Sequence, residues 1–325
     1  MKIHFSIFFV FIPYIFCTAQ LIKNSPVQIT VGTLNLNPEI IKKNKIKSIE
    51  VVITNKPDGQ MIVDKGSASG YRFNNNGYIT NFYYTILNTV AVVDETKSSS
   101  DNNKKRKSAN TPDWISYIND TIFTEIKYDS KNRISEKIMK SGNTFDIYHF
   151  EYDSINRIKK ETRFKQLILQ NDSSLSLGKK DQISAETFIY QELTPTQTKK
   201  SGFNSSNKLY KKTVINYDAK KNIVSERNEL IASWFRQEHF YWYNSSNQLI
   251  KKTYKSNESG LSEWEWIYEY GKNGNLVSEK KFKNKVLMYE SNYLYDDAGL
   301  LLKSEAARDY QSHCIIISKF QYAYY

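Results

Sequence analysis

Histidine and cysteine, which often serve as nucleophiles, bases or metal ligands, are few in this chain. Beyond the N-terminal apolar stretch they are His149, His239, His313 and Cys314. The histidines show no metal-ligand spacing, and His313 and Cys314, as neighbours in an extended strand, would point to opposite faces. The chain also lacks a Gly-rich phosphate loop and the G-x-S-x-G and H-E-x-x-H motifs. The sequence therefore predicts no enzyme, no metal site and no cofactor.

Aromatic side chains are the stronger candidates for binding. Four tryptophans fall between residues 234 and 266, and the alternation in SEWEWIYEY places some of them with a tyrosine on one strand face. Indole rings on a flat sheet can stack on sugar rings. We therefore expect either a carbohydrate-binding face or a buried aromatic ladder, built from Trp234, Trp242, Trp264, Trp266 and Tyr268.

Two short segments suit a covalent modification. Thr121 in DTI and Ser154 in DSI resemble Asp-Ser/Thr-aliphatic acceptors for O-glycosylation. By contrast, the basic run Lys104–Lys107 has no interleaved aromatic residue, so we expect no nucleic-acid binding.

One phrase recurs eight times and must position these residues. It consists of an aromatic residue, Asp or Asn, two polar or small residues, Gly or Asn, any residue, and Ile or Leu, with occasional departures. The copies begin at Phe73, Tyr128, Tyr152, Phe203, Tyr217, Tyr243, Tyr270 and Tyr295. A spacing near 25 residues is typical of a supersecondary repeat. The 51-residue step from Tyr152 to Phe203 indicates one degenerate copy between them.

Each copy predicts a β-hairpin turn. The Asp or Asn caps the turn by accepting backbone N–H bonds, and the Gly or Asn three residues later takes the left-handed conformation. A calcium site is not expected, because each turn offers one carboxylate and half of the copies replace it with Asn or Gly. The turn residues singled out are Asp129, Asn132, Asp153, Asn156, Asp218, Asp296 and Gly299.

The fold class that follows is all-β. We expect an antiparallel β-meander of hairpin repeats about 25 residues long, curled into a roll, an open barrel or a solenoid that covers its aromatic face. Residues 46–325 would form a single domain, with polar loop insertions at 95–113 and 170–182 and with terminal repeats acting as caps. Residues 20–45 would be a lead-in with a possible short helix in NPEIIKKNK.

The first 19 residues are typical of a secretory signal peptide. Lys2 precedes an apolar stretch, and small residues follow at Thr18 and Ala19. The alternative is a lipid anchor at Cys17, although Phe16 is bulky for the position before a lipidated cysteine. No later segment is apolar enough to cross a membrane as a helix. Localisation is therefore expected in the periplasm, at the outer-membrane surface or outside the cell.

The net charge of +12 is spread through the chain, with lysines placed beside glutamates. Mixed charge of this kind favours solubility and protection of strand edges over a dedicated basic site.

The phrase Y-D-x-x-G/N-R-I/L resembles the repeat of the Rhs/YD-repeat family of bacterial cell-surface proteins. YDSKNRI from Tyr128 and YDSINRI from Tyr152 are the closest copies, and YDDAGLL from Tyr295 keeps Tyr, Asp and Gly. The resemblance covers about residues 70–325 and implies a β-repeat architecture at the cell surface. Toxin delivery, known in large members of the family, is not expected, because the chain ends in SKFQYAYY without a toxin domain.

The function expected from these patterns is that of an exported, non-enzymatic binding or structural module. The alternatives are a carbohydrate-binding protein that uses the Trp-rich face and a polysaccharide-acting enzyme with a carboxylate pair, which no motif distinguishes. Expected partners are envelope glycans or surface proteins, and the chain is expected to be a monomer.

Overall fold

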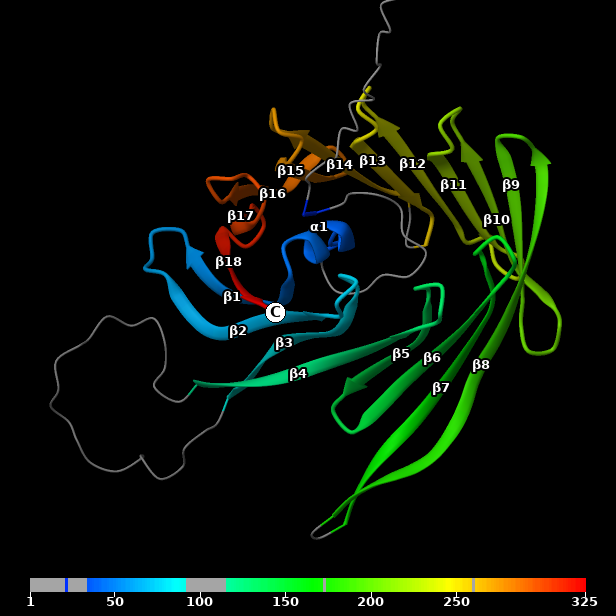
Figure 1. Cartoon of the computed structure of the whole chain (residues 1–325), viewed down its shortest axis with the longest axis horizontal. Coiled ribbons are helices and arrows are strands. Elements are labelled where there is room, and N and C mark those ends of the chain that lie inside the picture. The colour runs from blue at the N-terminus through cyan, green and yellow to red at the C-terminus, as the bar shows by residue number, and fades with distance from the viewer. Residues whose placement is uncertain (1–20, 23–33, 92–114, 172–173, 259–260) are drawn as a thin grey trace, which may run out of the picture.

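The structure is a closed antiparallel β-barrel. This computed structural model describes residues 21–22, 34–91, 115–171, 174–258 and 261–325. Each of the 18 strands pairs with the next one along the chain, and β1 pairs with β18 to close the ring (Figure 1). The expectation of an all-β antiparallel fold is confirmed.

The elements begin and end as follows in chain order. They are α1 (Pro38–Lys43), β1 (Ile46–Pro57), β2 (Val63–Phe73), β3 (Ile79–Ala91), β4 (Ile115–Tyr128), β5 (Ile134–Ser141), β6 (Thr144–Tyr152), β7 (Ile158–Asn171), β8 (Ser174–Thr194), β9 (Gln197–Phe203), β10 (Leu209–Tyr217), β11 (Ile223–Leu230), β12 (Arg236–Tyr243), β13 (Leu249–Ser256), β14 (Ser262–Tyr270), β15 (Leu276–Lys283), β16 (Val286–Tyr295), β17 (Leu302–Asp309) and β18 (Cys314–Tyr324).

Three parts of the expected architecture are corrected by this topology. The sheet is neither a roll nor a solenoid, and since β1 pairs with β18, no terminal repeat acts as a cap. Strand length varies from 7 residues in β9 to 21 in β8, so the chain is not an array of equal repeat units. The segment 170–182, expected as a polar loop, extends the β7–β8 hairpin, with residues 172–173 outside the described part. The signal peptide and the 95–113 insertion also lie outside the described residues.

Successive turns alternate between the two ends of the barrel. We call the end with the turns that follow even-numbered strands the repeat rim, and the other end the opposite rim. Seven copies of the phrase form turns of the repeat rim, whereas the copy at Phe203 joins β9 to β10 at the opposite rim. The step from Phe203 to Tyr217 is therefore half a period, because a single strand separates the two turns.

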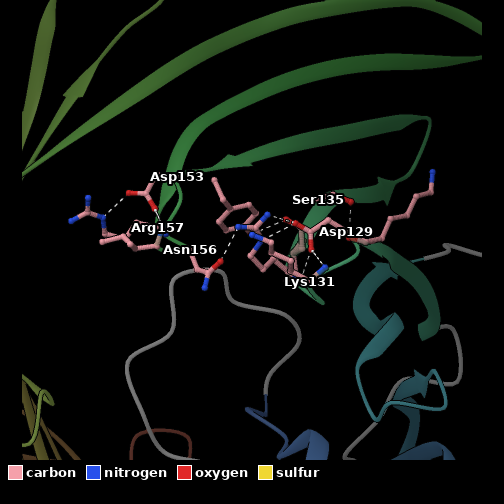
Figure 2. Close-up of polar contacts among 11 residues, drawn as sticks. Asp129, Lys131, Ser135, Asp153, Asn156 and Arg157 are labelled. Atoms are coloured by element: carbon pink, nitrogen blue, oxygen red, sulfur yellow. Dashed lines mark hydrogen bonds and ion pairs between the residues drawn. The ribbon is translucent and has the colours of Figure 1, made fainter.

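The turns have the geometry that their residues require. Asp129 Oδ1 accepts the backbone N–H groups of Lys131 and Arg133, at 2.9 and 3.0 Å, and Asn132 has φ of +58°. Asp129 Oδ2 also accepts from Arg133 Nε, at 2.7 Å. Figure 2 shows this turn beside the next one, where Asp153 and Arg157 repeat the arrangement. Asp218 makes the same backbone capping, whereas Asp296 accepts from the backbone N–H groups of Leu300 and Leu301. Left-handed φ values recur at Asn156, Lys221, Asn247, Gly274 and Gly299.

A tyrosine hydroxyl fastens each hairpin to its neighbour along most of the repeat rim. Tyr152 Oη donates to the carbonyl oxygen of Ile134, at 2.8 Å, which joins the β6–β7 hairpin to the β4–β5 hairpin. Arg133 stacks over the ring of Tyr152, 4.5 Å from its centroid, and buttresses this bond. The equivalent bonds run from Tyr128 to Ile79, Tyr190 to Ile158, Tyr243 to Ile223, Tyr270 to Leu249 and Tyr322 to Leu302.

Tyr190 identifies the degenerate copy of the phrase. Its hydroxyl bonds to Ile158, and Arg157 lies 4.2 Å from its ring centroid, as Arg133 does over Tyr152. The turn that follows, at residues 195–196, lacks the capping Asp and the left-handed residue. The ladder of tyrosine bonds is therefore continued where the turn sequence is lost.

The described residues before β1, 21–22 and 34–45, pack inside the barrel. Figure 1 shows α1 within the ring of strands. Asn37 caps this helix and Pro38 occupies its first turn, as Asn and Pro do at helix starts. The turn at residues 74–78 lies so close to α1 that a Cβ atom on Gly77 would stand 2.0 Å from the Pro38 carbonyl oxygen, and Gly77 also has φ of +82°. We call the described residues before β1 the plug. Its buried side chains are Leu21, Ile22, Leu36, Ile40 and Ile41, and they pack with strand residues that include Ile49, Tyr71, Phe82, Leu276 and Leu302.

The outer face of β13–β16 carries ion pairs between neighbouring strands. Lys255 on β13 lies 3.4 Å from Glu263 on β14, and Lys280 on β15 lies 3.6 Å from Glu290 on β16. Lys251 and Glu265 form a further pair at 2.5 Å. A lysine at the middle of a bilayer costs about 2–4 kcal/mol on a lipid-facing barrel wall. These pairs lie within the strands, so the outer wall of β13–β16 is built to face water.

No helix in the described ranges is both long and apolar enough to cross a membrane.

The tyrosine ladder predicts a contrast between two substitutions that delete the same atom. Tyr152→Phe removes the bond to Ile134, so we expect the free energy of unfolding to fall by about 1 kcal/mol. Tyr295→Phe should leave stability unchanged or raise it, because the Tyr295 hydroxyl is buried and has no hydrogen-bond partner among the described residues. Urea denaturation of both variants measures the difference. Equal losses in the two variants would show that the tyrosine bonds do not fasten the wall.

Candidate ligand-binding site in the barrel lumen

The inner wall of the barrel carries aromatic residues that face charged residues across neighbouring strands. Tyr268 on β14 is paired with Glu279 on β15, and Tyr293 on β16 is paired with Glu305 on β17. Tyr241 on β12 faces a lysine in the same way. That lysine is Lys252. Further pairs at this level of the barrel, two of them with isoleucine in place of the aromatic residue, are Ile126–Lys137, Phe150–Glu161 and Ile215–Glu226. We call these charged residues the inner charged ring.

Burial inside the barrel shifts the pKa values of several residues of the inner charged ring. Desolvation raises the pKa of Glu161, Glu279 and Glu305 above the ordinary carboxyl value. The same cause lowers the pKa of Lys137 and Lys252 below the ordinary ammonium value. Each shift favours the neutral form, because a charge inside the barrel has lost part of its water.

Two indole side chains on β14 lie next to the inner charged ring. Trp264 and Trp266 are half-buried on the inner face, with their centroids 6.3 Å apart and their planes inclined by 29°. Lys281 Nζ lies 4.6 Å from the centroid of Trp264, and Lys252 Nζ lies 4.8 Å from that of Trp266. Lys283 Nζ approaches Trp264 to 5.3 Å. The indole pair is therefore surrounded by ammonium groups from both neighbouring strands, which favours cation–π contact.

A cavity of about 480 Å³ lies beside this group, between the plug and the inner wall. Tyr268, Glu279 and Lys281 line one side of it, and Ile22 and Leu34 of the plug line the other. The remaining lining residues are Asn35, Val51, Ile53, Ser69, Tyr71, Tyr289, Ser291, Tyr293, Glu305, Ser318 and Phe320. Its size falls in the range of small-ligand pockets.

The two carboxyl groups of the cavity are held by hydroxyl groups. Tyr293 Oη donates to Glu279 Oε2 at 3.2 Å. The hydroxyl groups of Ser291 and Tyr293 act on the pKa of Glu305 in the opposite direction to burial, because they favour its charged form. The cavity thus combines apolar ring faces, carboxyl oxygens, hydroxyl groups and the ammonium group of Lys281, which together can bind a molecule rich in hydroxyl groups.

The structure separates the five residues that the sequence grouped as one binding face. Trp264, Trp266 and Tyr268 do share the inner face, but Trp242 lies on the outer face of β12, where it is 42% exposed. Trp234 lies in the turn at residues 231–235 and is 97% exposed. The expected face of four tryptophans is wrong, because Trp234 is not in a strand and Trp242 has the opposite parity to Tyr241.

The other residues noted in the sequence lie apart from the cavity. His149 is on the outer wall, 3.3 Å from Glu136, whereas His239 is on the inner face of β12. Within the described ranges, no group of three or more His, Cys, Asp or Glu residues could hold a metal ion. Thr121 is on the outer face of β4, and Ser154 is exposed in a repeat-rim turn.

The inner charged ring is the feature that sequence reasoning missed. Lys137, Glu161, Glu226, Lys252 and Glu279 each lie nine residues after the aromatic residue of their repeat. Glu305 lies ten residues after Tyr295, where the turn is one residue longer. A charged residue at this fixed position was visible in the aligned copies, but its place on the inner wall depends on the turn geometry.

Comparison with known proteins leaves the family of the chain open. No family model matches it, and no curated protein matches it. The resemblance to the Rhs/YD-repeat family therefore stays a prediction.

Three solved structures share limited similarity with the barrel. A porin-like protein from Bacteroides uniformis is 10% identical, covers 86% of this chain and 98% of its own, and has a TM-score of 0.38. A porin-like protein from Bacteroides vulgatus is 8% identical over 62% of this chain and 92% of its own, with a TM-score of 0.29. A chain of the Photorhabdus luminescens Tc holotoxin pore is 14% identical over 72% of this chain and 12% of its own, with a TM-score of 0.28. At these scores the similarity carries no argument about function.

The buried carboxyl groups predict a pH dependence of stability. Burial raises the pKa of Glu279 above 4.5, so its contribution to stability is full below pH 4.5 and is lost as the pH rises through the folded-state pKa. Glu279→Gln should therefore raise the melting temperature at pH 7 and leave it unchanged at pH 4. The exposed outer-wall variant Glu269→Gln serves as the control and should change little at either pH. A Glu279→Gln variant that melts earlier than wild type at pH 7 would contradict this description of the cavity.

Proposed function

We propose that the protein is a non-catalytic binding protein of the cell envelope whose barrel lumen accepts an acidic carbohydrate. The observation that carries the proposal is the half-buried Trp264–Trp266 pair, flanked by Lys252, Lys281 and Lys283 and placed beside a cavity with carboxyl and hydroxyl groups. The apolar face of a sugar ring stacks on indole. A carboxylate or sulfate on the sugar forms charge-assisted bonds with the ammonium groups.

The geometry of the wall supports a lumenal site over an external one. An 18-stranded barrel is too wide for its own side chains to fill. The described plug packs against β1–β3 and against Leu276 and Leu302 at the repeat rim, and a cavity remains beside β14–β18. Trp242, on the outer wall, has a lysine near its ring, at 5.4 Å, and does not line the cavity.

The carboxyl pair in the cavity supports binding over hydrolysis. A glycosidase needs one ionised and one protonated carboxyl group, so their pKa values must be driven apart. Here burial raises the pKa of both Glu279 and Glu305. Two groups shifted in the same direction suit hydrogen bonding to hydroxyl groups better than a division into acid and nucleophile.

The envelope location rests on the N-terminal signal sequence and agrees with an outer wall that faces water. Within the envelope, a surface or a periplasmic position serves this function equally, since the ligand enters the barrel and not a membrane.

Tryptophan fluorescence tests the proposal directly. In a Trp234→Phe, Trp242→Phe background, which removes the two exposed indoles of the described residues, titration with oligogalacturonate should change the emission to saturation, whereas neutral cello-oligosaccharides should have a much smaller effect. Adding Trp266→Ala should weaken the binding about tenfold or more, because stacking and burial of one aromatic side chain contribute about 1.5–3 kcal/mol.

The controls separate this site from other surfaces and from catalysis. Trp242→Ala in the wild-type chain should bind as the unaltered protein does, and no reducing ends should appear on prolonged incubation. A flat titration with every acidic glycan would remove the proposed function, and release of reducing ends that Glu279→Gln abolishes would replace it with hydrolysis.

A further inference from the structure

The opposite rim exposes apolar side chains at the tips of several separate turns. Trp234 is 97% exposed in the β11–β12 turn, Leu261 92% before β14, and Met61 85% in the β1–β2 turn. Val286 and Ile62 are also exposed, at 62% and 58%. The repeat-rim turns are built from polar residues, and among their described residues the large exposed apolar side chain is Ile155. The two ends of the barrel therefore present different chemistry to their surroundings.

The exposed tryptophan is held in place by the neighbouring turn. Asn257 Nδ2 donates to the carbonyl oxygen of Trp234, at 2.5 Å, and Asn257 Oδ1 accepts from the backbone N–H of Arg236, at 2.8 Å. One side chain thus braces the β11–β12 turn on both sides of the indole. Trp234 is therefore exposed on a turn whose backbone is fixed by hydrogen bonds.

Similar clamps support the other apolar tips. Asn284 Oδ1 accepts from the backbone N–H of Glu263, at 2.9 Å, two residues before Val286. Arg308 makes a two-fold ion pair with Asp58, which anchors the β1–β2 turn that carries Met61 and Ile62. Polar bonds between adjacent turns therefore fix a series of apolar tips along the rim from β11 to β2.

We propose that the opposite rim docks end-on to the surface of an anionic lipid bilayer. Trp and aliphatic tips insert into the headgroup region, where an indole has its preferred position. Basic side chains stand beside the tips: Lys285 precedes Val286, and Lys56 is the second-last residue of β1. Arg236, two residues after Trp234, forms an ion pair with Glu238. The chain carries a net charge of +12, which attracts it to an anionic surface. The ion pairs on the outer wall prevent insertion along its side, so contact is confined to the rim.

Vesicle flotation tests the docking of the purified full-length chain. Wild-type protein should float with vesicles of phosphatidylcholine and phosphatidylglycerol, less with pure phosphatidylcholine, and less again as salt screens the charges. Trp234→Ser combined with Leu261→Ser should weaken binding to the mixed vesicles about tenfold or more, because two apolar side chains no longer leave water. The repeat-rim variant Ile155→Ser and the outer-wall variant Leu294→Ser, whose side chains are 63% and 61% exposed, should bind like wild type.

Quenching by brominated lipids locates the contact. Emission should be quenched on binding in the wild type, and most of this quenching should vanish in Trp234→Phe while flotation persists. Absence of flotation with every vesicle, or equal losses in the Ile155→Ser control, would overturn the proposal. A concentration-dependent dimer in sedimentation that the double variant abolishes, without any vesicle binding, would assign the rim to a second copy of the chain instead.

Discussion

The hydrogen bond from a tyrosine hydroxyl to a carbonyl of the neighbouring hairpin is the interaction on which the rest of the barrel depends. A ring of 18 strands encloses more space than its own side chains can fill, so packing in the interior cannot by itself hold the wall together. The tyrosine bonds and the capped turns beside them join most hairpins to the next at one rim. In the described chain the densest apolar packing is around the plug, against β1, β2 and β3.

A wall fastened at its rim can be polar on both faces. The outer face carries ion pairs across β13–β16, and the inner face carries charged residues paired with aromatic ones. Such an inner wall would be poorly stable in a small barrel, where each charge would be fully desolvated. In a wide lumen the charges stay partly solvated, and the ring can remain available to a ligand. Under the proposed function the roles are separate: one rim holds the fold, the lumen binds the ligand, and the other rim presents apolar tips.

The sequence predicted the local structure of the turns better than the closure of the sheet into a barrel. Asp129, Asn132 and their counterparts determine their own turns, since capping and left-handed backbone depend on nearby atoms alone. Pairing of β1 with β18 depends on the number and stagger of all strands, which no single copy of the phrase encodes. The grouping of Trp234 and Trp242 with Trp264 failed for a related reason. Which alternate residues of a strand face the lumen changes at each bulge and turn, so it cannot be carried from one strand to the next. The role of Tyr190 could not be predicted, because the turn that follows it lacks the capping Asp and the left-handed residue of the other copies.

The most direct measurement is the behaviour of the purified chain in buffer without detergent. A wall that faces water on both sides predicts a folded, β-rich single species in sedimentation velocity and circular dichroism, with one cooperative thermal transition and no change on adding mild detergent. A chain that aggregates in buffer and acquires its β-structure and cooperative melting only in detergent micelles would contradict a water-facing barrel fastened at its rim.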